Sequence, residues 1–208
     1  MEPAIEAIAI GGSAGALDAL SHILPALPPT FPVPIVLVLH IPPSRPSYLP
    51  EVLGSMCALR VKEAEDKEPL VAGTVYTAPP DYHLLVEKQR VLSLSVDDPV
   101  LFSRPAIEVL FESAADAFGP HLMGVLLAGG SADGARGLAR IKRAGGLALV
   151  QAPSSAAVRT MPQAAIDLGI VDHALAPDAL GTFLAKLGEQ PISLSESSHG
   201  TVQNSDRR

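Results

Sequence analysis

Ser13 is the residue whose type and surroundings most clearly suggest chemistry. It lies within residues 11–15, and the remaining four residues of this segment are all glycine or alanine. An apolar run at 5–10 precedes this segment and an amphipathic stretch at 16–27 follows it, so we predict a turn from a buried strand into a helix. That is the geometry of a nucleophile elbow, G-x-S-x-G. Because a serine hydroxyl is a poor nucleophile at neutral pH, it needs a base and an orienting acid elsewhere in the chain.

His40 and Asp133 are the candidates for the base and the acid. His40 follows the apolar run at 35–39, and Asp133 lies in a glycine-rich stretch after the apolar run at 122–127. Both runs are short and continuous, which favours buried strands over core helices. If the strands are parallel, all three polar residues lie at the sheet edge where open α/β folds place their sites. We therefore expect Ser13, His40 and Asp133 to converge.

Each of the three residues also has a simpler interpretation. The serine could cap the helix that follows it. The histidine could be a hydrogen-bonded residue at the end of a strand. The pair Asp133-Gly134 is a good turn and helix N-cap signal. On the residues alone these alternatives stay open.

The composition excludes several classes of partner. The chain has 208 residues, a formal net charge of −7 and no cluster of Lys and Arg, which argues against nucleic acid. No apolar run approaches the roughly 20 residues that span a bilayer, and the N-terminus lacks the basic region of a signal peptide. The single cysteine, Cys57, fits a reducing compartment. We expect a cytoplasmic protein that inserts in no membrane.

Strand and helix signals alternate along most of the chain, which predicts a three-layer α/β/α fold with a mainly parallel, doubly wound sheet. Segments 84–87 and 91–96 predict a small antiparallel hairpin beside it. We expect one domain at 1–187 and a disordered, Ser-rich tail at 188–208. The further predicted strands are 59–64, 73–78 and 147–151, and the further helices are 48–56, 105–118, 135–144, 162–168 and 177–187.

The helix predicted at 105–118 carries two specific expectations. Pro105 suits the first helical position, where its missing N–H costs nothing. Glu108, Glu112 and Asp116 recur every four residues, and we interpret this acidic row as a solvated face. The histidines show no metal-ligand spacing, so we predict no metal and assign them no role; they are His22, His83, His121, His173 and His199.

The order of several short segments resembles the catalytic domain of CheB, the chemotaxis protein-glutamate methylesterase family. The resemblance runs from about residue 5 to about residue 187 and rests on six segments together with Met161-Pro162. Those segments are 10–15 around the serine, 40–43 after the histidine strand, 61–66, 76–79, 104–105, and 129–134 around the aspartate.

The resemblance implies hydrolysis of glutamate methyl esters on the cytoplasmic helices of chemoreceptors or related sensory proteins, and deamidation of certain glutamines. It implies the triad Ser13, His40 and Asp133 without a cofactor. Backbone N–H groups near Ala14 and Gly130 would bind the oxyanion. Arg104 would either contact the substrate or pair with an acid.

The chain also departs from the family pattern. The family has Gly-Met-Gly before its aspartate, whereas this chain has glycine at 129 and 130 and then Ser131, which loosens the loop. The catalytic segment begins within the first ten residues, so we expect no receiver domain. We expect either an ungated esterase or one regulated by another protein, such as a histidine kinase or a separate regulator. The alternative to an esterase is a CheB-like signalling module that binds its partner and has lost turnover.

Overall fold

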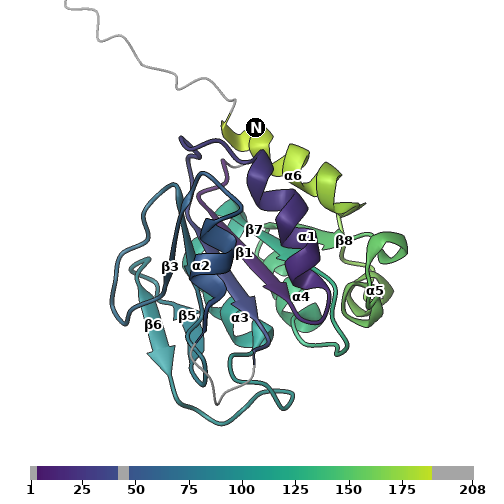
Figure 1. The fold of residues 1–208 in the computed structure, drawn as a ribbon. Helices are drawn as coiled ribbons and strands as arrows, with labels where there is room; N and C mark the ends of the chain where they lie inside the picture. Colours follow the sequence, from purple (N-terminus) through teal and green to yellow (C-terminus); the bar gives the residue numbers. More distant parts are fainter. Residues whose placement is uncertain (1–3, 42–46, 189–208) are drawn as a thin grey trace, which may run out of the picture.

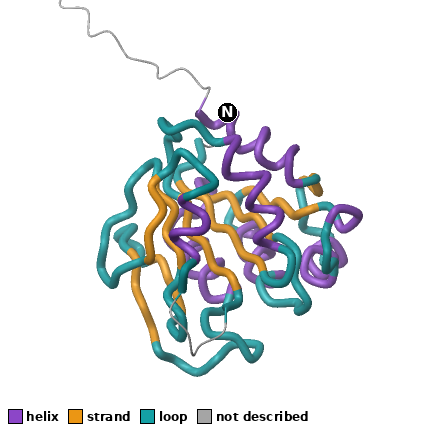
Figure 2. The backbone as a smooth tube through the Cα atoms, in the orientation of Figure 1, coloured by secondary structure: helices purple, strands orange, loops and turns teal. Residues whose placement is uncertain are grey.

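The computed structural model describes residues 4–41 and 47–188. A seven-stranded sheet runs through the molecule in the order β3-β4-β2-β1-β7-β8-β9, and every neighbouring pair in it is parallel (Figures 1 and 2). A separate antiparallel pair, β5-β6, lies beside it. The strands are β1 (Ala7–Gly12), β2 (Ile35–Leu39), β3 (Arg60–Glu63), β4 (Thr74–Thr77), β5 (His83–Val86), β6 (Leu92–Ser95), β7 (Leu122–Leu126), β8 (Leu147–Gln151) and β9 (His173–Leu175).

Helices cover both faces of the sheet, and each face has its own core. Along β1, Ile8 and Ile10 face one core, whereas Ala7 and Ala9 face the other, as the alternation of a strand requires. The first core packs α1 (Ala16–Ile23), α2 (Leu49–Gly54) and α6 (Pro177–Ala185). The second packs α3 (Ile107–Phe118), α4 (Ala135–Arg143) and α5 (Thr160–Asp167). The predicted three-layer α/β/α fold is therefore confirmed.

The predicted elements differ from the observed ones at specific points. The prediction that Pro105 opens a helix is wrong, because α3 begins at Ile107 and Ala106 occupies its N-cap. The first helix ends at Ile23 and continues only as a short 3₁₀ turn, Leu24–Ala26. Strand β9 has no counterpart among the predictions, since its three residues carry little apolar pattern. Residues 42–46, which follow the His40 segment, and nearly all of the predicted tail at 188–208 lie outside the described residues.

The parallel sheet separates the two ends of its strands into two edges. Ser13 and His40 follow β1 and β2 directly, and residues 127–134 follow β7, so these segments share the carboxyl edge. The helix after β1 covers one face and the helix after β7 covers the other. The ends of β1 and β7 are therefore a topological switch point, which is where doubly wound folds bind ligands.

Candidate active site

Ser13 occupies a tight turn between β1 and α1. Its N–H donates to the carbonyl of Ala128 (2.8 Å), and its own carbonyl accepts the N–H of Ala16 (2.9 Å). Gly15 has φ +87°, and a Cβ there would lie 2.9 Å from the Cβ of Ala157, so glycine is required on both counts. No side chain among the described residues caps α1, so the helix-cap interpretation of Ser13 is wrong. The serine hydroxyl is left available.

His40 lies next to Ser13 across the sheet. Strands β1 and β2 pair in register up to Gly12 and Leu39, and the His40 N–H donates to the Gly12 carbonyl (3.1 Å). The next residues of the two strands are thus Ser13 and His40. Among the hydrogen bonds of residues 4–41 and 47–188, none joins the Ser13 hydroxyl to the imidazole.

Asp133 binds the imidazole from the other side. Its Oδ2 lies 2.7 Å from His40 Nε2, and its side chain is fully buried. The same carboxylate accepts the backbone N–H groups of Ile107 (2.7 Å) and Glu108 (3.0 Å), the first two residues of α3. It does not cap the helix that follows it in sequence, where the N-cap is Gly134 with φ +87°. The simple N-cap interpretation of Asp133 is therefore wrong for α4, and the residue caps α3 instead.

The start of α3 is capped from outside the helix. Its N-cap residue, Ala106, has no polar side chain, and the Ala106 N–H donates to Nδ1 of His83 (3.2 Å). The Nε2 of His83 in turn donates to the Asp98 carbonyl (3.1 Å). The expectation from the sequence that His83 has no role is corrected by the structure. The buried His83 and Asp133 together accept N–H groups that the start of a helix leaves unpaired. The N-terminus of α3 and the carboxylate of Asp133 therefore hold one another in position.

Glu108 is a second carboxylate behind Asp133. Its Oε2 accepts the N–H of Gly134 (3.1 Å), and only 7% of the residue is exposed. Burial raises the pKa of Glu108, and the nearby charge of Asp133 raises it further. The prediction of a solvated acidic face is wrong at this residue, although Glu112 and Asp116 are exposed as expected. The four-residue spacing does not show that Glu108 lies in the first turn of α3, where the 131–134 loop covers it.

The glycine-rich loop after β7 presents a free donor close to the serine. Both backbone groups of Gly129 are used, since its N–H donates to Val158 (3.0 Å) and its carbonyl accepts from Met161 (2.9 Å). A Cβ on Gly129 would meet Met161 Sδ at 2.6 Å and Ser13 Cβ at 3.0 Å, so the loop packs directly on the serine. Within the described part of the chain, the N–H groups of Ala14 and Gly130 have no acceptor.

Arg104 lies at the rim of the pocket that contains His40. Its guanidinium donates to Asp81 Oδ1 (2.7 and 3.0 Å) and to the carbonyls of Val96 (2.8 Å) and Asp97 (3.0 Å). Of the two expectations for Arg104, pairing with an acid is confirmed, while contact with a substrate stays a prediction. The pocket holds about 170 Å³, and Ser13 is not among the residues that line it.

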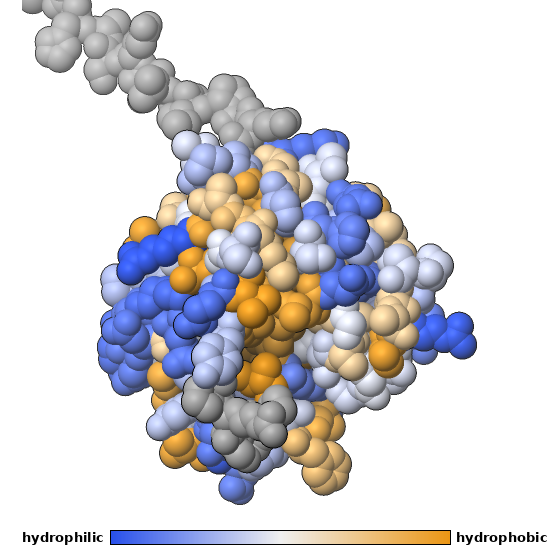
Figure 3. Space-filling view, in the orientation of Figure 1, coloured by the Kyte–Doolittle hydropathy of each residue, from blue (hydrophilic) through white to orange (hydrophobic). Residues whose placement is uncertain are grey.

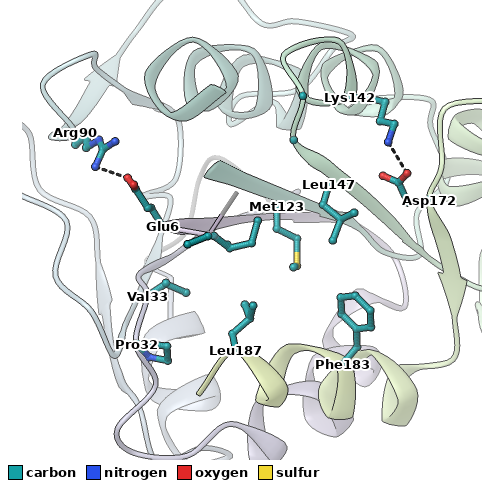
Figure 4. A pocket seen from close by; sticks show the side chains of 14 residues that line it. Glu6, Pro32, Val33, Arg90, Met123, Lys142, Leu147, Asp172, Phe183 and Leu187 are labelled. Atoms are coloured by element: carbon teal, nitrogen blue, oxygen red, sulfur yellow. Dashed lines mark hydrogen bonds and ion pairs between the residues drawn. The ribbon is translucent and has the colours of Figure 1, made fainter. Parts of the chain in front are cut away.

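A larger pocket of about 770 Å³ lies at the opposite edge of the sheet, where the strands begin (Figure 4). Its floor is apolar, with Met123, Leu147 and Phe183 pointing inward. Its charges are engaged with one another, in the pairs Arg90–Glu6 and Lys142–Asp172. None of the predicted site residues lines it.

Metal-binding clusters and membrane-spanning helices are both absent from residues 4–41 and 47–188. In this part of the chain, no group of three His, Cys, Asp or Glu side chains is arranged to hold a metal ion. No helix within these residues has both the length and the apolar character needed to cross a membrane.

The fold and these groups define a class: a doubly wound α/β protein whose ligand-binding edge carries the residue types of a serine hydrolase. The CheB methylesterase family matches residues 8–184. A relative from Leptospira interrogans is 45% identical over 187 residues, which cover 90% of this chain and 97% of that protein. The chain belongs to the CheB methylesterase family.

Other relatives give the same result. A protein-glutamate methylesterase/protein-glutamine glutaminase of Carboxydothermus hydrogenoformans is 39% identical over 86% of this chain and 54% of its own length. The CheB methylesterase catalytic domain of Thermotoga maritima has a similar crystal structure, with a TM-score of 0.85 and 34% identity. That similarity covers 89% of this chain and all of the other. The resemblance inferred from the seven short segments is confirmed.

Proposed function

We propose that this protein hydrolyses methyl esters of glutamate side chains on chemoreceptors or related sensory proteins, and that it deamidates certain glutamines. The names of its relatives support the reaction class. The observation that carries the proposal is the hydrogen-bonded pair of His40 and the buried Asp133 beside Ser13, at the carboxyl edge of a parallel sheet. A serine without such a pair would be a poor nucleophile.

In the proposed reaction the Ser13 hydroxyl attacks the ester carbonyl while His40 takes its proton. Because Nε2 of His40 faces Asp133, the nitrogen that receives the proton is Nδ1. The imidazolium then protonates the departing methoxide, which is released as methanol. The glutamyl group remains bound to Ser13 as an ester. Water, deprotonated by His40, hydrolyses this acyl-enzyme and restores the serine. With a glutamine substrate the first leaving group is ammonia.

Asp133 orients the imidazole and stabilises its positive charge in this scheme. Its position is rigid because it is also the cap of α3. The developing oxyanion would accept hydrogen bonds from the N–H groups of Ala14 and Gly130, which are free of other acceptors among the described residues. The Ser13–His40 hydrogen bond would form by rotation of the side chains when substrate binds, as is common for catalytic contacts.

We further propose that the protein acts in the cytoplasm, under a separate regulator such as a histidine kinase. The lone cysteine, Cys57, is half-buried and unpaired with another cysteine, which accords with a reducing compartment. The substrate would be the cytoplasmic helices of the receptor.

A second candidate is a CheB-like module that binds its partner without turnover. Two observations favour it: the described residues contain no Ser13–His40 hydrogen bond, and exposed Gly130 stands where the family has methionine. A glycine there leaves the oxyanion donor less firmly held, and preorganisation is what makes such a donor effective.

The experiment that separates the two is methanol release from methylated chemoreceptor membranes. The wild-type protein should release methanol, and Ser13→Ala should lower the rate by about 10³-fold or more. Thermal unfolding of the variant should match that of the wild type, because the Ser13 hydroxyl holds no element in place. No release by a folded wild-type protein would refute the esterase and favour the binding module.

A further inference from the structure

The loop between β6 and α3 ends in an unusual turn. The N–H of Val100 donates to the Ser103 carbonyl (3.1 Å), and the N–H of Ser103 donates to the Val100 carbonyl (2.9 Å). These bonds close a two-residue hairpin turn over Leu101 and Phe102, which have φ of 49° and 64°. A turn with two left-handed residues normally contains Asn-Gly, because other side chains are strained in this conformation.

The two residues are also unfavourable at the surface. Phe102 is fully exposed and Leu101 is half exposed. In Figure 1 this loop forms the lower edge of the molecule, and Figure 3 shows apolar surface projecting there. Neither burial nor turn chemistry favours this Leu-Phe pair, and contact with an apolar partner would offset the cost of exposing it.

The turn lies between the pocket that contains His40 and a second, largely apolar groove. Phe102 lines the pocket that contains His40. Leu101 lines a separate groove of about 410 Å³, whose walls include Ala132, next to Asp133, and the half-exposed Leu168. The groove is also lined by one ion pair, in which the largely exposed Arg136 lies 4.0 Å from Oε1 of the buried Glu108.

The base of the loop is held firmly. Arg104 binds the carbonyls of Val96 and Asp97 and the carboxylate of Asp81, so both sides of the loop are tied to one guanidinium. A tip mounted on such a base loses little conformational entropy when it is contacted.

We propose that Leu101 and Phe102, with the adjoining groove, dock the segment of the substrate protein that carries the glutamyl ester. The segment would be amphipathic: apolar side chains would contact the turn and the groove, and polar side chains would face the Arg136–Glu108 pair at its wall. The pocket that contains His40 has room for little more than one side chain, so affinity for a protein substrate would have to come from contacts outside it. This inference rests on the proposed esterase function.

The test is the double variant Leu101→Asn/Phe102→Gly, which keeps the turn and removes both apolar side chains. The substrates are methylated chemoreceptor membranes and the small ester p-nitrophenyl acetate. We expect KM for the membranes to rise by about 10- to 100-fold, given what burial of two apolar side chains contributes. The loss of kcat/KM should be at least about tenfold larger for the receptor than for the small ester. Thermal stability should increase, because Asn-Gly relieves the strain.

The matched control is Val71→Ser, which removes an exposed apolar side chain at the opposite edge of the sheet, before β4. This variant should have wild-type kcat and KM with both substrates. Equal losses on the two substrates, or an unchanged KM for the receptor, would overturn the docking proposal while leaving the esterase intact. A wild-type protein that hydrolyses the small ester but releases no methanol from the membranes would instead refute the proposed function, and the docking site with it.

Direct binding gives a readout without turnover. In a Ser13→Ala background, receptor membranes should retain the protein on sedimentation, and the added Leu101→Asn/Phe102→Gly change should weaken that retention by about tenfold or more. Equal retention of both proteins would contradict the proposal.

Discussion

The two edges of the sheet both carry a pocket and a buried or half-buried carboxylate, but they use them differently. At the amino edge, Asp172 accepts the Ala148 N–H (2.9 Å) and pairs with Lys142, and the pocket beside it holds about 770 Å³ (Figure 4). At the carboxyl edge, Asp133 accepts two N–H groups and pairs with His40, beside a pocket of only about 170 Å³.

The difference lies in the base and in the unpaired groups. Lysine keeps its proton at neutral pH, whereas histidine can gain and lose one. At the carboxyl edge, two backbone N–H groups have no acceptor among the described residues, and the Ser13 hydroxyl lies next to them. If the proposed triad is the reacting site, the larger pocket is not the one that marks it, and the unpaired polar groups at the strand ends are the better guide.

Asp133→Asn should give the largest effect and sharpen the comparison. The amide cannot stabilise an imidazolium, so methanol release should fall by about 10³- to 10⁴-fold. One of its two polar atoms becomes a donor facing the N–H groups of α3, so the free energy of unfolding should fall by about 1–3 kcal/mol. Urea denaturation alongside the rate assay checks both. Loss of activity with unchanged stability would show that the carboxylate does not cap α3.

Asp172→Asn is the matched change at the amino edge. It weakens the pairing with Lys142 and disturbs the bond from the Ala148 N–H, so we expect a loss of about 1 kcal/mol in the free energy of unfolding. Methanol release should stay at the wild-type rate. A fall in kcat without a fall in stability would break the comparison, because it would give the amino edge a part in the reaction.

Glu108→Gln tests the second carboxylate of the carboxyl edge. Its pKa is raised in the folded protein, so the stability that its protonated form contributes is present below the ordinary value of 4.5 and is lost as pH rises through the raised value. Glutamine does not titrate. The stability of the variant relative to the wild type should therefore increase with pH across that interval, measured by urea unfolding at several pH values. A difference that stays constant with pH would contradict the shift.

Gly130→Ala should have the smallest effect. A Cβ at this position would lie 3.9 Å from Val158 Cγ1, which is ordinary contact, and Gly130 is not among the residues with positive φ. The variant should gain about 0.4–1 kcal/mol in stability, because alanine restricts the unfolded chain. We also expect a modest rise in kcat, since a stiffer loop holds the N–H more firmly. A loss of kcat at full stability would mean that catalysis needs the freedom of glycine.

Much of the fold was readable from local pattern. The strands β2 and β8 match their predicted bounds, because each is a continuous apolar run between turn residues. Ser13, His40 and Asp133 could be placed at strand ends for the same reason. Strand β9 could not, since its pairing with β8 supplies what its sequence lacks. Pro105 led to a wrong helix start, because the sequence alone does not distinguish a proline just before a helix from one at its first position.

The sequence by itself determined which residues stand at the carboxyl edge, because short apolar runs specify strands and parallel strands share their ends. Only the tertiary structure decided what those residues bind. The cap that Asp133 and His83 form on α3 joins positions about 25 residues apart, and the burial of Glu108 follows from the packing of α3 against the loop before α4. Such contacts depend on how separate elements meet in space, which no local pattern of residues records.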